Sequence, residues 1–507
     1  MLDAEKHIQQ RWFKPCMIAL SPIVLSLLLQ LPIMLINSSP YYDEATYLDI
    51  SRNILRWGLP YRSSNELPGT LYFFHPPFGR YLTAAGLFLF GDTLAVARTL
   101  SSFASILLIF LFFRFLRKET NALVASVFST ILATQSLFLV YAHSAYVEMP
   151  LTLLCFSGYL AILRAQPSIT RNQADMWTII ASVLFGVATL FKYHAVLYFL
   201  PIAVYVGLRH LEFRRALLLL LMPTTFLSLW LLAAWNLDPA IFRRDILWTI
   251  HQTLGQGEYR SPLIPWRFFV FKEFLPALGP TLFLAVPVLF ILLGLRKTQT
   301  IMSRNAPSLV ALLVLAASFT ATLAISYKQT RYIVPALPLL IFLVGQLTYA
   351  KAKTFEDCKT GNRFCIAVAT AILITASPAL DLCLGLSGTV FGRPRQFRGI
   401  YSESLNHAKH YAGLDRVAAK LREIGTLDYD LILGPGEITN LLTYYARARF
   451  CEGEKCQKAT FLVFNPNKPD HMAFVRSHRP HITDFHLVAR FANMGPWIGP
   501  LELWKRK

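Results

Sequence analysis

Long apolar runs alternate along the chain with short polar segments that carry arginine and lysine. A helix needs roughly 20 apolar residues to cross the hydrocarbon core of a bilayer. The runs at 17–36, 94–115, 307–325 and 331–349 are clear cases, and turns or charges interrupt the others. The pattern predicts eleven transmembrane helices, at 17–36, 94–116, 121–140, 147–164, 177–191, 194–209, 215–234, 275–295, 307–326, 331–350 and 364–386.

Two neighbouring runs, 177–191 and 194–209, are short, so they fit either a helical hairpin or one long tilted helix. The flanking charges decide between these structures. Basic residues precede and follow the pair, at positions 164, 171, 209, 214 and 215. Short cytoplasmic loops collect lysine and arginine, so both flanks belong on the same side of the membrane. We therefore expect a hairpin whose tip is Lys192-Tyr193-His194.

The same charge rule orients the rest of the chain. It predicts a multi-pass membrane protein, in a bacterial inner or plasma membrane, with a cytoplasmic N-terminus and an extracytoplasmic C-terminal region. The first span is expected to be a retained anchor, since no small-residue cleavage pattern follows it. The segment 235–274 is an exception, because it is predicted to lie outside and yet carries several basic residues.

Two regions lie outside the spans. In the outer loop 37–93, the apolar residues Tyr47, Ile50, Ile54 and Trp57 recur at helical spacing, so the pattern predicts an interfacial helix over 45–57. Its other face would carry polar residues, at positions 49, 52, 53 and 56. A second interfacial helix is expected to begin after Pro76-Pro77 and to end at Gly91-Asp92.

The polar tail, 387–507, alternates between strand and helix patterns. Strands are expected at 429–433, 460–464, 486–491 and 501–504, and helices at 413–424 and 438–446. The fold class is thus an α-helical polytopic membrane protein, with a membrane module at 1–386 and a small extracytoplasmic α/β domain at 387–507. Cys451 and Cys456 are placed either to form a disulfide or to remain free thiols.

Composition agrees with the membrane class. Hydrophobic residues make up 54% of the 507 residues and charged residues only 15%, whereas a soluble chain has about 25% charged residues. The formal net charge is +20. Short cytoplasmic loops account for much of this excess, and no module that combines basic and aromatic residues for nucleic acid is present. Nucleic acid is therefore excluded as a partner.

Charged residues at a membrane boundary are costly without partners, so each is a candidate functional residue. Several are predicted to meet on the outer side: Asp43, Glu44, Arg52, His75, Glu148, Lys192, Lys328 and Arg331, with Tyr332 beside the last. Carboxylates suit the removal of a proton from an attacking hydroxyl. Lysine and arginine suit a phosphate leaving group. This combination predicts sugar transfer from a polyprenyl-phosphate donor.

Four motifs resemble the GT-C superfamily of integral-membrane glycosyltransferases, in the branch of protein O-mannosyltransferases and the aminoarabinose transferase. They are Asp43-Glu44 before an interfacial helix, His75-Pro76-Pro77, Leu190-Phe191-Lys192, and Arg331-Tyr332 with Pro335 and Pro338. The resemblance covers about residues 1–350.

The resemblance implies an inverting transfer without a covalent intermediate. Asp43 would be the general base, and Glu44 and Glu148 would orient the acceptor or the base. The donor phosphate would be bound by Lys192, Lys328 and Arg331. Further contacts with the substrate would come from Arg52, His75 and Tyr332. No metal or other cofactor is expected, although other branches use a divalent ion near the same acids. Many relatives have aspartate where this chain has Glu148.

Other interpretations stay open at this point. Each acid alone is compatible with a solvated loop or a helix start, and each lysine or arginine with an interfacial anchor. A transporter or flippase of lipid-linked sugars would also have many spans, although it should show internal repeats and acids near the midplane. A non-catalytic subunit of a glycan-assembly complex is a third possibility. If the protein is a glycosyltransferase, its acceptor is a protein, a lipid or a glycan.

Overall fold

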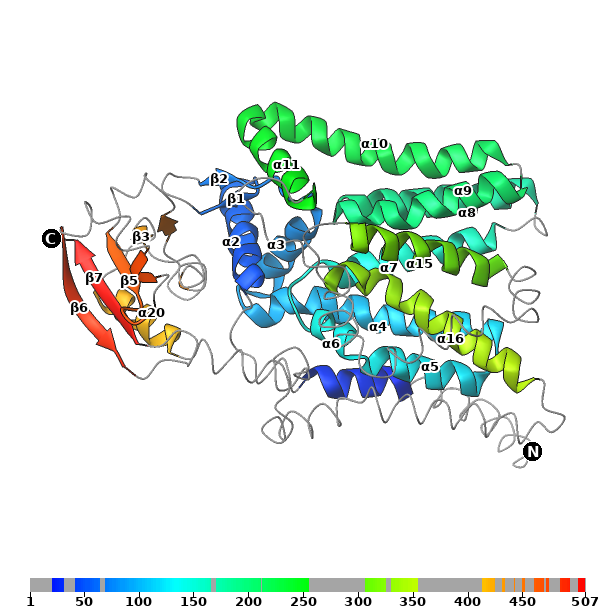
Figure 1. The fold of residues 1–507 in the computed structure, drawn as a ribbon, viewed down its shortest axis with the longest axis horizontal. Helices are drawn as coiled ribbons and strands as arrows, with labels where there is room; N and C mark the ends of the chain where they lie inside the picture. Colours follow the sequence, from blue (N-terminus) through cyan, green and yellow to red (C-terminus); the bar gives the residue numbers. More distant parts are fainter. Residues whose placement is uncertain are drawn as a thin grey trace.

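The computed structural model describes most of the helical region and parts of the tail. These residues are 21–31, 42–63, 69–165, 170–210, 212–254, 306–324, 330–353, 413–424, 431–433, 442, 449–451, 460–468, 471–473, 484–492 and 500–506. Figure 1 shows long helices lying side by side as a bundle, with shorter elements and a sheet at one end.

The bundle helices lie over the predicted spans wherever the chain is described. They are α4 (Leu94–Glu119), α5 (Ala122–Thr134), α6 (Ser136–Ala142), α7 (Glu148–Arg164), α8 (Arg171–Thr189), α9 (Val196–His210), α10 (Phe213–Leu237), α15 (Ala306–Ala324) and α16 (Leu337–Ala352). A further helix spans Ser21–Leu31. The predicted spans 275–295 and 364–386 lie outside the described residues, so the number eleven stays a prediction.

Three of the described helices are long and apolar enough to cross a membrane: Leu94–Glu119, Phe213–Leu237 and Arg331–Ala350. The outward face of α10 is correspondingly apolar, with exposed leucines at positions 217, 221, 229 and 232. Such a surface is stable only against lipid or another apolar partner. These features agree with a polytopic membrane protein.

The predicted hairpin is confirmed. Helix α8 ends at Thr189, and a short turn leads through the 3-10 helix η1 (Tyr193–Ala195) into the start of α9. Backbone hydrogen bonds from Phe191 and Lys192 to the carbonyl of Ala188 close the turn. Lys192 is therefore held at the tip between two helices.

Two of the predicted segments differ in the structure. The span expected at 121–140 is two helices, because Gln135 adopts an extended backbone and its side chain accepts a hydrogen bond from the Phe138 N–H at 2.8 Å. The segment 235–274, expected to be a loop, contains the helix α11 (Pro239–Leu254). The span expected at 331–350 coincides with the apolar segment Arg331–Ala350, and its first turns are the 3-10 helix η3 (Thr330–Ala336), which contains Pro335.

Both predicted interfacial helices are present, as α2 (Tyr42–Trp57) and α3 (Phe78–Phe90). Tyr47, Ile50 and Ile54 are buried as expected, but Trp57 is half exposed. Gly91, with φ 101°, ends α3 as expected.

The expected polar face of α2 is partly wrong. Asp49 and Asn53 are buried, because the antiparallel pair β1 (Tyr61–Arg62) and β2 (Thr70–Leu71) folds back onto α2. Asp49 accepts hydrogen bonds from the backbone N–H and the hydroxyl of Ser63, at 2.8 and 2.6 Å. The polar residues of this face thus fasten the outer loop to the helix.

The described parts of the tail form one mixed sheet, with helical residues at 414–423, 442 and 471–473. The strands β3 (Leu431–Leu433), β4 (Arg449–Cys451), β5 (Phe461–Phe464), β6 (Phe485–Phe491) and β7 (Leu501–Arg506) have the order β4-β3-β5-β7-β6. Helix α20 (Leu414–Glu423) packs on the sheet through Leu414, Val417 and Leu421. The strand β4 was not expected. The helix expected at 438–446, the domain boundary near 386 and Cys456 lie largely or wholly outside the described residues.

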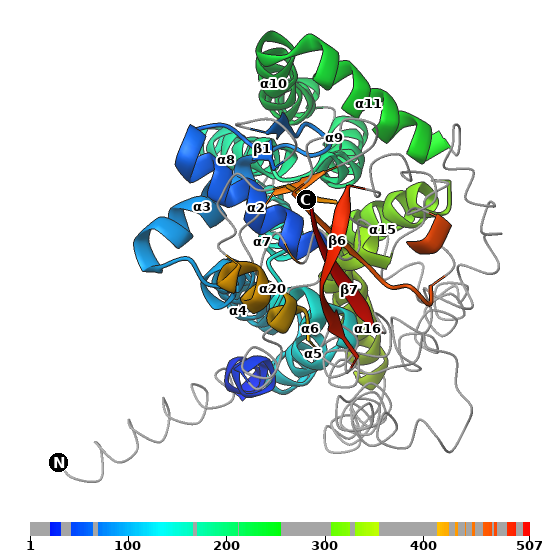
Figure 2. The same ribbon diagram turned by 90° about the vertical axis from the view of Figure 1, so that its left-hand side faces the viewer.

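The tail lies beside the start of α2. Ala45, one turn into α2, belongs to the same apolar cluster as Leu414, Phe461 and Leu503 of the tail. Figure 2, viewed from the tail's side, shows β6, β7 and α20 in front of α2 and the helical bundle. The tail therefore borders the end of the bundle at which Asp43 and Glu44 lie.

Candidate active site

The acid that begins α2 meets the cation that begins η3. Asp43 lies in the first turn of α2 and Arg331 in the first turn of η3, 288 residues later, and Arg331 Nη1 donates to Asp43 Oδ2 at 2.8 Å. The Arg331 side chain is 13% exposed and that of Asp43 is 35% exposed. Asp43 is thus oriented by a cation and still accessible, as a general base must be.

The second acid of the pair is buried and fully engaged. Glu44 accepts from Arg98 of α4 through both oxygens, at 3.1 and 2.8 Å, and from the backbone N–H of Ala145 at 2.5 Å. Both side chains of the ion pair are almost completely buried, at 0% and 1% exposure. These contacts connect α2 to α4 and to the loop that leads to Glu148. Glu44 therefore has a structural role: it fixes the start of α2, which carries Asp43, relative to Glu148.

Arg98 was not among the candidates from the sequence. It lies inside the predicted span 94–116, where a charge is costly unless it has a partner. That rule was the available signal, and it points to the role that Arg98 has.

The third acid pairs with the lysine of the hairpin tip. Lys192 Nζ lies 2.5 Å from Glu148 Oε1, and both side chains are buried, at 3% and 1% exposure. Burial lowers the pKa of Lys192 to about 8, although the carboxylate of Glu148 acts in the opposite direction. The other oxygen of Glu148, Oε2, has no hydrogen-bond partner in the described part of the chain.

Gly79 is the point at which these elements converge. It lies in the first turn of α3, and a Cβ atom there would come within 2.4 Å of Val147 Cγ1 and 3.1 Å of a ring carbon of Phe191. Val147 precedes Glu148, and Phe191 precedes Lys192. The missing side chain at Gly79 therefore lets α3 approach both members of the Glu148–Lys192 pair.

A further buried cation was missed from the sequence. Arg80 of α3 is 3% exposed, and its guanidinium carbon lies 3.2 Å from the centroid of the Tyr47 ring. Among the described residues, its Nη1 has no hydrogen-bond partner, and neither has Arg331 Nε. The signal was its position five residues after His75, on a helix already predicted to lie at the interface.

Two histidines lie among these cations and stay neutral. Desolvation lowers the pKa of His75 well below its usual value, and nearby Lys192, Arg331 and Arg80 lower it further. His194 stacks on the ring of Tyr332 with centroids 4.3 Å apart, and Lys192 Nζ lies 5.8 Å from the same ring. Tyr332, which the sequence analysis paired with Arg331, thus also lies beside Lys192 and His194.

The remaining candidates divide. Arg52 forms an ion pair with Asp92 at 2.9 Å, on the loop that follows α3, and none of the contacts described for it reaches Asp43 or Lys192. Lys328 lies outside the described residues. The structure therefore brings together Asp43, Glu148, Lys192, His75, Arg331 and Tyr332, and adds Arg80.

Charge within this group is unbalanced. Among the described residues of the site, the cations Arg80, Lys192 and Arg331 face only two carboxylates, Asp43 and Glu148. Two of the cations have buried N–H groups that lack a partner. Buried N–H donors of this kind are costly unless a ligand accepts from them. The site is therefore suited to an anion with several oxygen acceptors.

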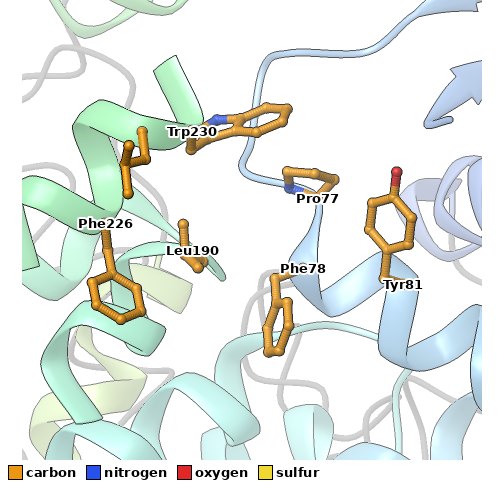
Figure 3. Close-up of a pocket in the computed structure, with 7 residues that line it drawn as sticks. Pro77, Phe78, Tyr81, Leu190, Phe226 and Trp230 are labelled. Atoms are coloured by element: carbon orange, nitrogen blue, oxygen red, sulfur yellow. The ribbon is translucent and has the colours of Figure 1, made fainter. Parts of the chain in front are cut away.

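An apolar pocket of about 370 Å³ begins beside these cations. Figure 3 shows it between α3 and α10, with Leu190 at its inner end. Its lining residues are Pro77, Phe78, Tyr81, Leu190, Phe226, Leu229 and Trp230. The backbone N–H of Phe78 donates to the carbonyl of Leu190 at 3.3 Å, which joins the two walls. Leu190 lies two residues before Lys192 and Pro77 two residues after His75, so the pocket and the cations are neighbours.

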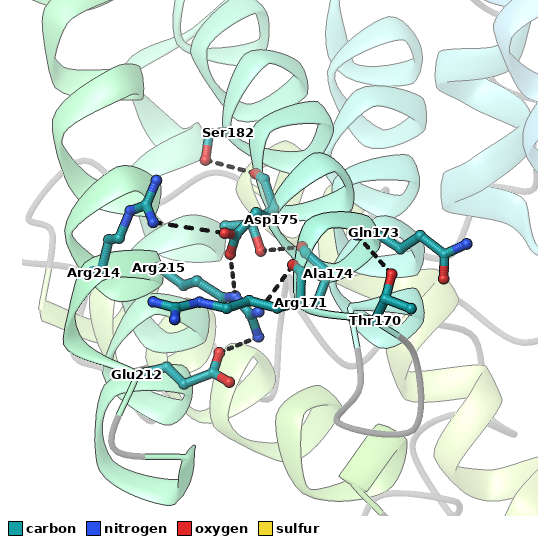
Figure 4. A network of polar contacts seen from close by, with 10 residues as sticks. Thr170, Arg171, Gln173, Ala174, Asp175, Ser182, Glu212, Arg214 and Arg215 are labelled. Carbon is teal, nitrogen blue, oxygen red and sulfur yellow. Dashed lines mark hydrogen bonds and ion pairs between the residues drawn. The ribbon is translucent and has the colours of Figure 1, made fainter.

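The opposite end of the bundle carries a separate polar network (Figure 4). Arg215 donates to Asp175 at 2.7 Å and also pairs with Glu212, and Arg214 lies 3.7 Å from Asp175. These contacts join the first turn of α8 to the first turns of α10. Helix α8 is 19 residues long, so the network lies about 28 Å from the tip that carries Lys192.

Within the described residues, no group of three or more His, Cys, Asp or Glu side chains has the arrangement of a metal site. The expectation of a metal-independent site stays a prediction. The acids are instead each paired with a cation, as Asp43–Arg331, Glu44–Arg98 and Glu148–Lys192.

No curated protein sequence matches the chain. A family model for dolichyl-phosphate-mannose-protein mannosyltransferase matches residues 74–241, which include His75, Arg80, Glu148 and Lys192.

Solved structures show the same fold at low sequence identity. ArnT from Cupriavidus metallidurans, bound to undecaprenyl phosphate, matches with a TM-score of 0.64 and 18% identity over 96% of this chain and 98% of that chain. The oligosaccharyltransferase of Archaeoglobus fulgidus in the apo form matches with a TM-score of 0.56 and 12% identity, over 88% and 69%. The archaeal oligosaccharyltransferase AglB from the same organism, with an inhibitory peptide and a dolichol-phosphate, gives 0.54 and 12%, over 89% and 70%. The family model thus matches the part of the chain that carries these four residues, and the solved structures have a fold similar to that of this chain.

Proposed function

We propose that the protein transfers a sugar from a polyprenyl-phosphate donor to an acceptor hydroxyl, with inversion at the anomeric carbon. One observation carries this proposal. Three cations, two of which have buried N–H groups without a partner among the described residues, lie together with an accessible carboxylate, and an apolar pocket is lined by residues that adjoin Lys192 and His75 in the chain. A lipid phosphate has the charge and the hydrocarbon chain that such a combination fits.

The assignment of roles follows from the contacts. The donor phosphate takes hydrogen bonds from Arg80 and Arg331 and faces Lys192, and the first part of the polyprenyl chain enters the apolar pocket. The similar structures of ArnT and AglB contain undecaprenyl phosphate and dolichol-phosphate. His75 is neutral in this field, so it donates or accepts a hydrogen bond without adding charge.

The reaction is a single displacement. The acceptor oxygen attacks the anomeric carbon, its proton passes to the Asp43 carboxylate, and the bond from that carbon to the phosphate oxygen breaks. Polyprenyl phosphate leaves with the electron pair, and the cations stabilise its growing negative charge. Arg331 contacts Asp43 directly, so it links the base to the phosphate side. Glu148 holds Lys192, and Glu44 positions Asp43 from behind.

The orientation proposed from the sequence has support in the fold. The network of Arg171, Arg214 and Arg215 lies at the far end of the bundle from Lys192, where the positive-inside rule expects a cytoplasmic surface. The site then faces the periplasm or its equivalent, in a bacterial inner or plasma membrane. The tail borders Asp43, on the side from which an acceptor protein, lipid or glycan would approach.

The test uses membranes that contain equal amounts of wild-type protein, Asp43→Asn and Asp92→Asn. Each is given radiolabelled polyprenyl-phosphate sugars, and label is followed into acceptors. Transfer by wild type and Asp92→Asn, but not by Asp43→Asn, is the expected result, because Asp92 makes the same kind of ion pair away from the cations. Equal transfer by all three would remove Asp43 from the mechanism.

A transporter of lipid-linked sugars and a non-catalytic subunit are the competing functions. Both predict no transfer with any donor, and a transporter predicts instead that wild-type protein moves the labelled lipid across a sealed vesicle. Activity that persists after treatment with a chelator would support the prediction that no metal takes part.

A further inference from the structure

The segment that carries His75 has no regular structure of its own. Residues 72–77 form neither a helix nor a strand, so packing and isolated hydrogen bonds must hold them in place. Phe73 is the anchor of this segment. Its ring is completely buried, with centroids 5.9 Å from Trp230 of α10 and 6.2 Å from Phe242 of α11. The next ring, of Phe74, lies 4.7 Å from Trp248 of α11.

The backbone of Phe73 joins two further elements. Its N–H donates to Asp245 Oδ2 of α11 at 2.9 Å. Its carbonyl accepts from the hydroxyl of Tyr193 at 3.4 Å. Tyr193 follows Lys192 at the hairpin tip, and His75 lies two residues beyond Phe73. Phe73 therefore connects α11 to the segments that carry His75 and Lys192, through the two peptide groups on either side of its Cα.

The residue of α11 that makes this connection is a buried carboxylate, Asp245. Its side chain is 0% exposed, and its second oxygen accepts from Arg244, whose own side chain is 54% exposed. Burying a carboxylate costs free energy unless hydrogen bonds compensate for the lost hydration. Apolar packing alone would bury the Phe73 ring, but it would not fix the direction of the Phe73 peptide. A carboxylate fixes that direction, because it accepts from the peptide N–H with narrow geometry.

Helix α11 is well placed for such a role. It reverses direction after the end of α10 (Figure 1), and its residues Phe242, Asp245 and Trp248 contact the segment that carries His75. Its start is capped by Asp238, whose side chain accepts from the N–H groups of Ala240 and Ile241, both at 3.0 Å.

We propose that Asp245 is a positioning residue for the donor-phosphate site. Through the Phe73 peptide it sets the places of His75 and, by way of Tyr193, of Lys192. The inference rests on the proposed binding of a polyprenyl phosphate at these cations. It assigns α11 to the donor side of the site.

The test measures binding of radiolabelled polyprenyl phosphate, which needs no turnover, to purified full-length protein in detergent. The variants are Asp245→Ala, Asp245→Asn and the matched control Arg243→Ala, which removes an exposed charge from the same helix. Asp245→Ala should weaken binding about tenfold, because it leaves a buried peptide N–H without an acceptor. Asp245→Asn keeps an acceptor oxygen, so its binding should stay within about twofold of wild type, as should that of Arg243→Ala.

A second variant separates positioning from stability. Tyr193→Phe removes the hydrogen bond on the other side of Phe73. If the backbone of Phe73 transmits position, Tyr193→Phe should weaken binding of polyprenyl phosphate. The fold-loss of binding in the double variant Tyr193→Phe/Asp245→Ala should then be smaller than the product of the fold-losses in the two single variants. Thermal unfolding of each variant shows whether global stability changed. Unchanged binding by Asp245→Ala, or a loss that follows the melting temperature alone in all variants, would overturn the inference. A wild-type protein that does not bind polyprenyl phosphate would instead remove the proposed function, and this inference with it.

Discussion

Gly79 offers the sharpest test of how the site is assembled. Alanine at this position places a Cβ atom 2.4 Å from Val147 Cγ1, whereas ordinary contact begins at 3.4 Å. The neighbours must therefore separate by about 1.0 Å, which is the difference between those two distances. Val147 and Phe191 precede Glu148 and Lys192, so the displacement falls on the ion pair of the site.

The magnitudes follow from packing. Forcing a methyl group into a well-packed contact costs about 1–3 kcal/mol of stability. Alanine favours the helical state over glycine by up to about 1 kcal/mol, and less in a first turn. We expect a net loss of about 0–3 kcal/mol in unfolding free energy. Activity should suffer more, because a displacement of about 1 Å in a catalytic group can reduce the rate about 100-fold.

Gly86 supplies the control on the same helix. A Cβ atom there would meet only Val96 Cγ1, at 3.8 Å. Gly86→Ala should therefore leave transfer activity unchanged and raise stability slightly. The double variant Gly79→Ala/Val147→Ala should regain part of the activity, because it removes the nearer of the two clashes while the contact with Phe191 at 3.1 Å remains.

The assay is kcat/KM for transfer from a labelled donor, with thermal unfolding measured on the same samples. Wild-type activity in Gly79→Ala would refute the reasoning, because the elements would then not be in the contact described. Equal losses in Gly79→Ala and Gly86→Ala would assign the effect to the helix rather than to the site.

Three other predictions concern the pairs and the pocket. The pKa of Lys192 is lowered to about 8 by burial, so its charged form is present below that pH, and kcat/KM should fall about tenfold per unit above it; a pH profile of Lys192→Arg should lack this limb. Arg98→Met should destabilise the protein by about 3–5 kcal/mol, because it leaves Glu44 buried without its partner. Adding Glu44→Gln should recover part of that loss in a double-mutant cycle of unfolding free energies, and additive losses would argue against the pair. Leu229→Trp, which reduces the apolar pocket, should raise KM for long-chain donors about tenfold and for short-chain donors less, whereas Leu232→Trp, on the exposed face of α10, should change neither.

Much of the site was predictable because membrane energetics make charges conspicuous. Asp43, Glu148, Lys192 and Arg331 all stand at the ends of apolar runs, where an unpaired charge is costly, and the charge rule placed them on one side. The pairing was not predictable. Periodicity describes one helix at a time, whereas Arg331 and Asp43 are 288 residues apart and Glu148 and Lys192 are 44 apart.

The missed features have related causes. Arg98 was counted as part of a span, although its burial against Glu44 is what makes it tolerable there. Helix α11 has no long apolar run, because only one of its faces packs on Phe73 and Phe74, so 235–274 was expected to be a loop. The interruption between α5 and α6 depends on the Gln135 side chain, which caps the start of α6. Counting apolar residues along the chain does not detect such a cap.

The bridge between Glu44 and Arg98 also has an evolutionary consequence. Loss of either residue alone leaves a buried, unpaired charge, so intermediates with a single substitution should be selected against. We expect the two positions, 54 residues apart, to vary together across relatives and to be either both charged or both uncharged. A surface acid such as Glu423, which is itself 67% exposed in its pair with Lys420, should vary freely. Substitutions at positions 44 and 98 should therefore occur together during divergence. An alignment of distant relatives would reveal them as covariation between the two positions.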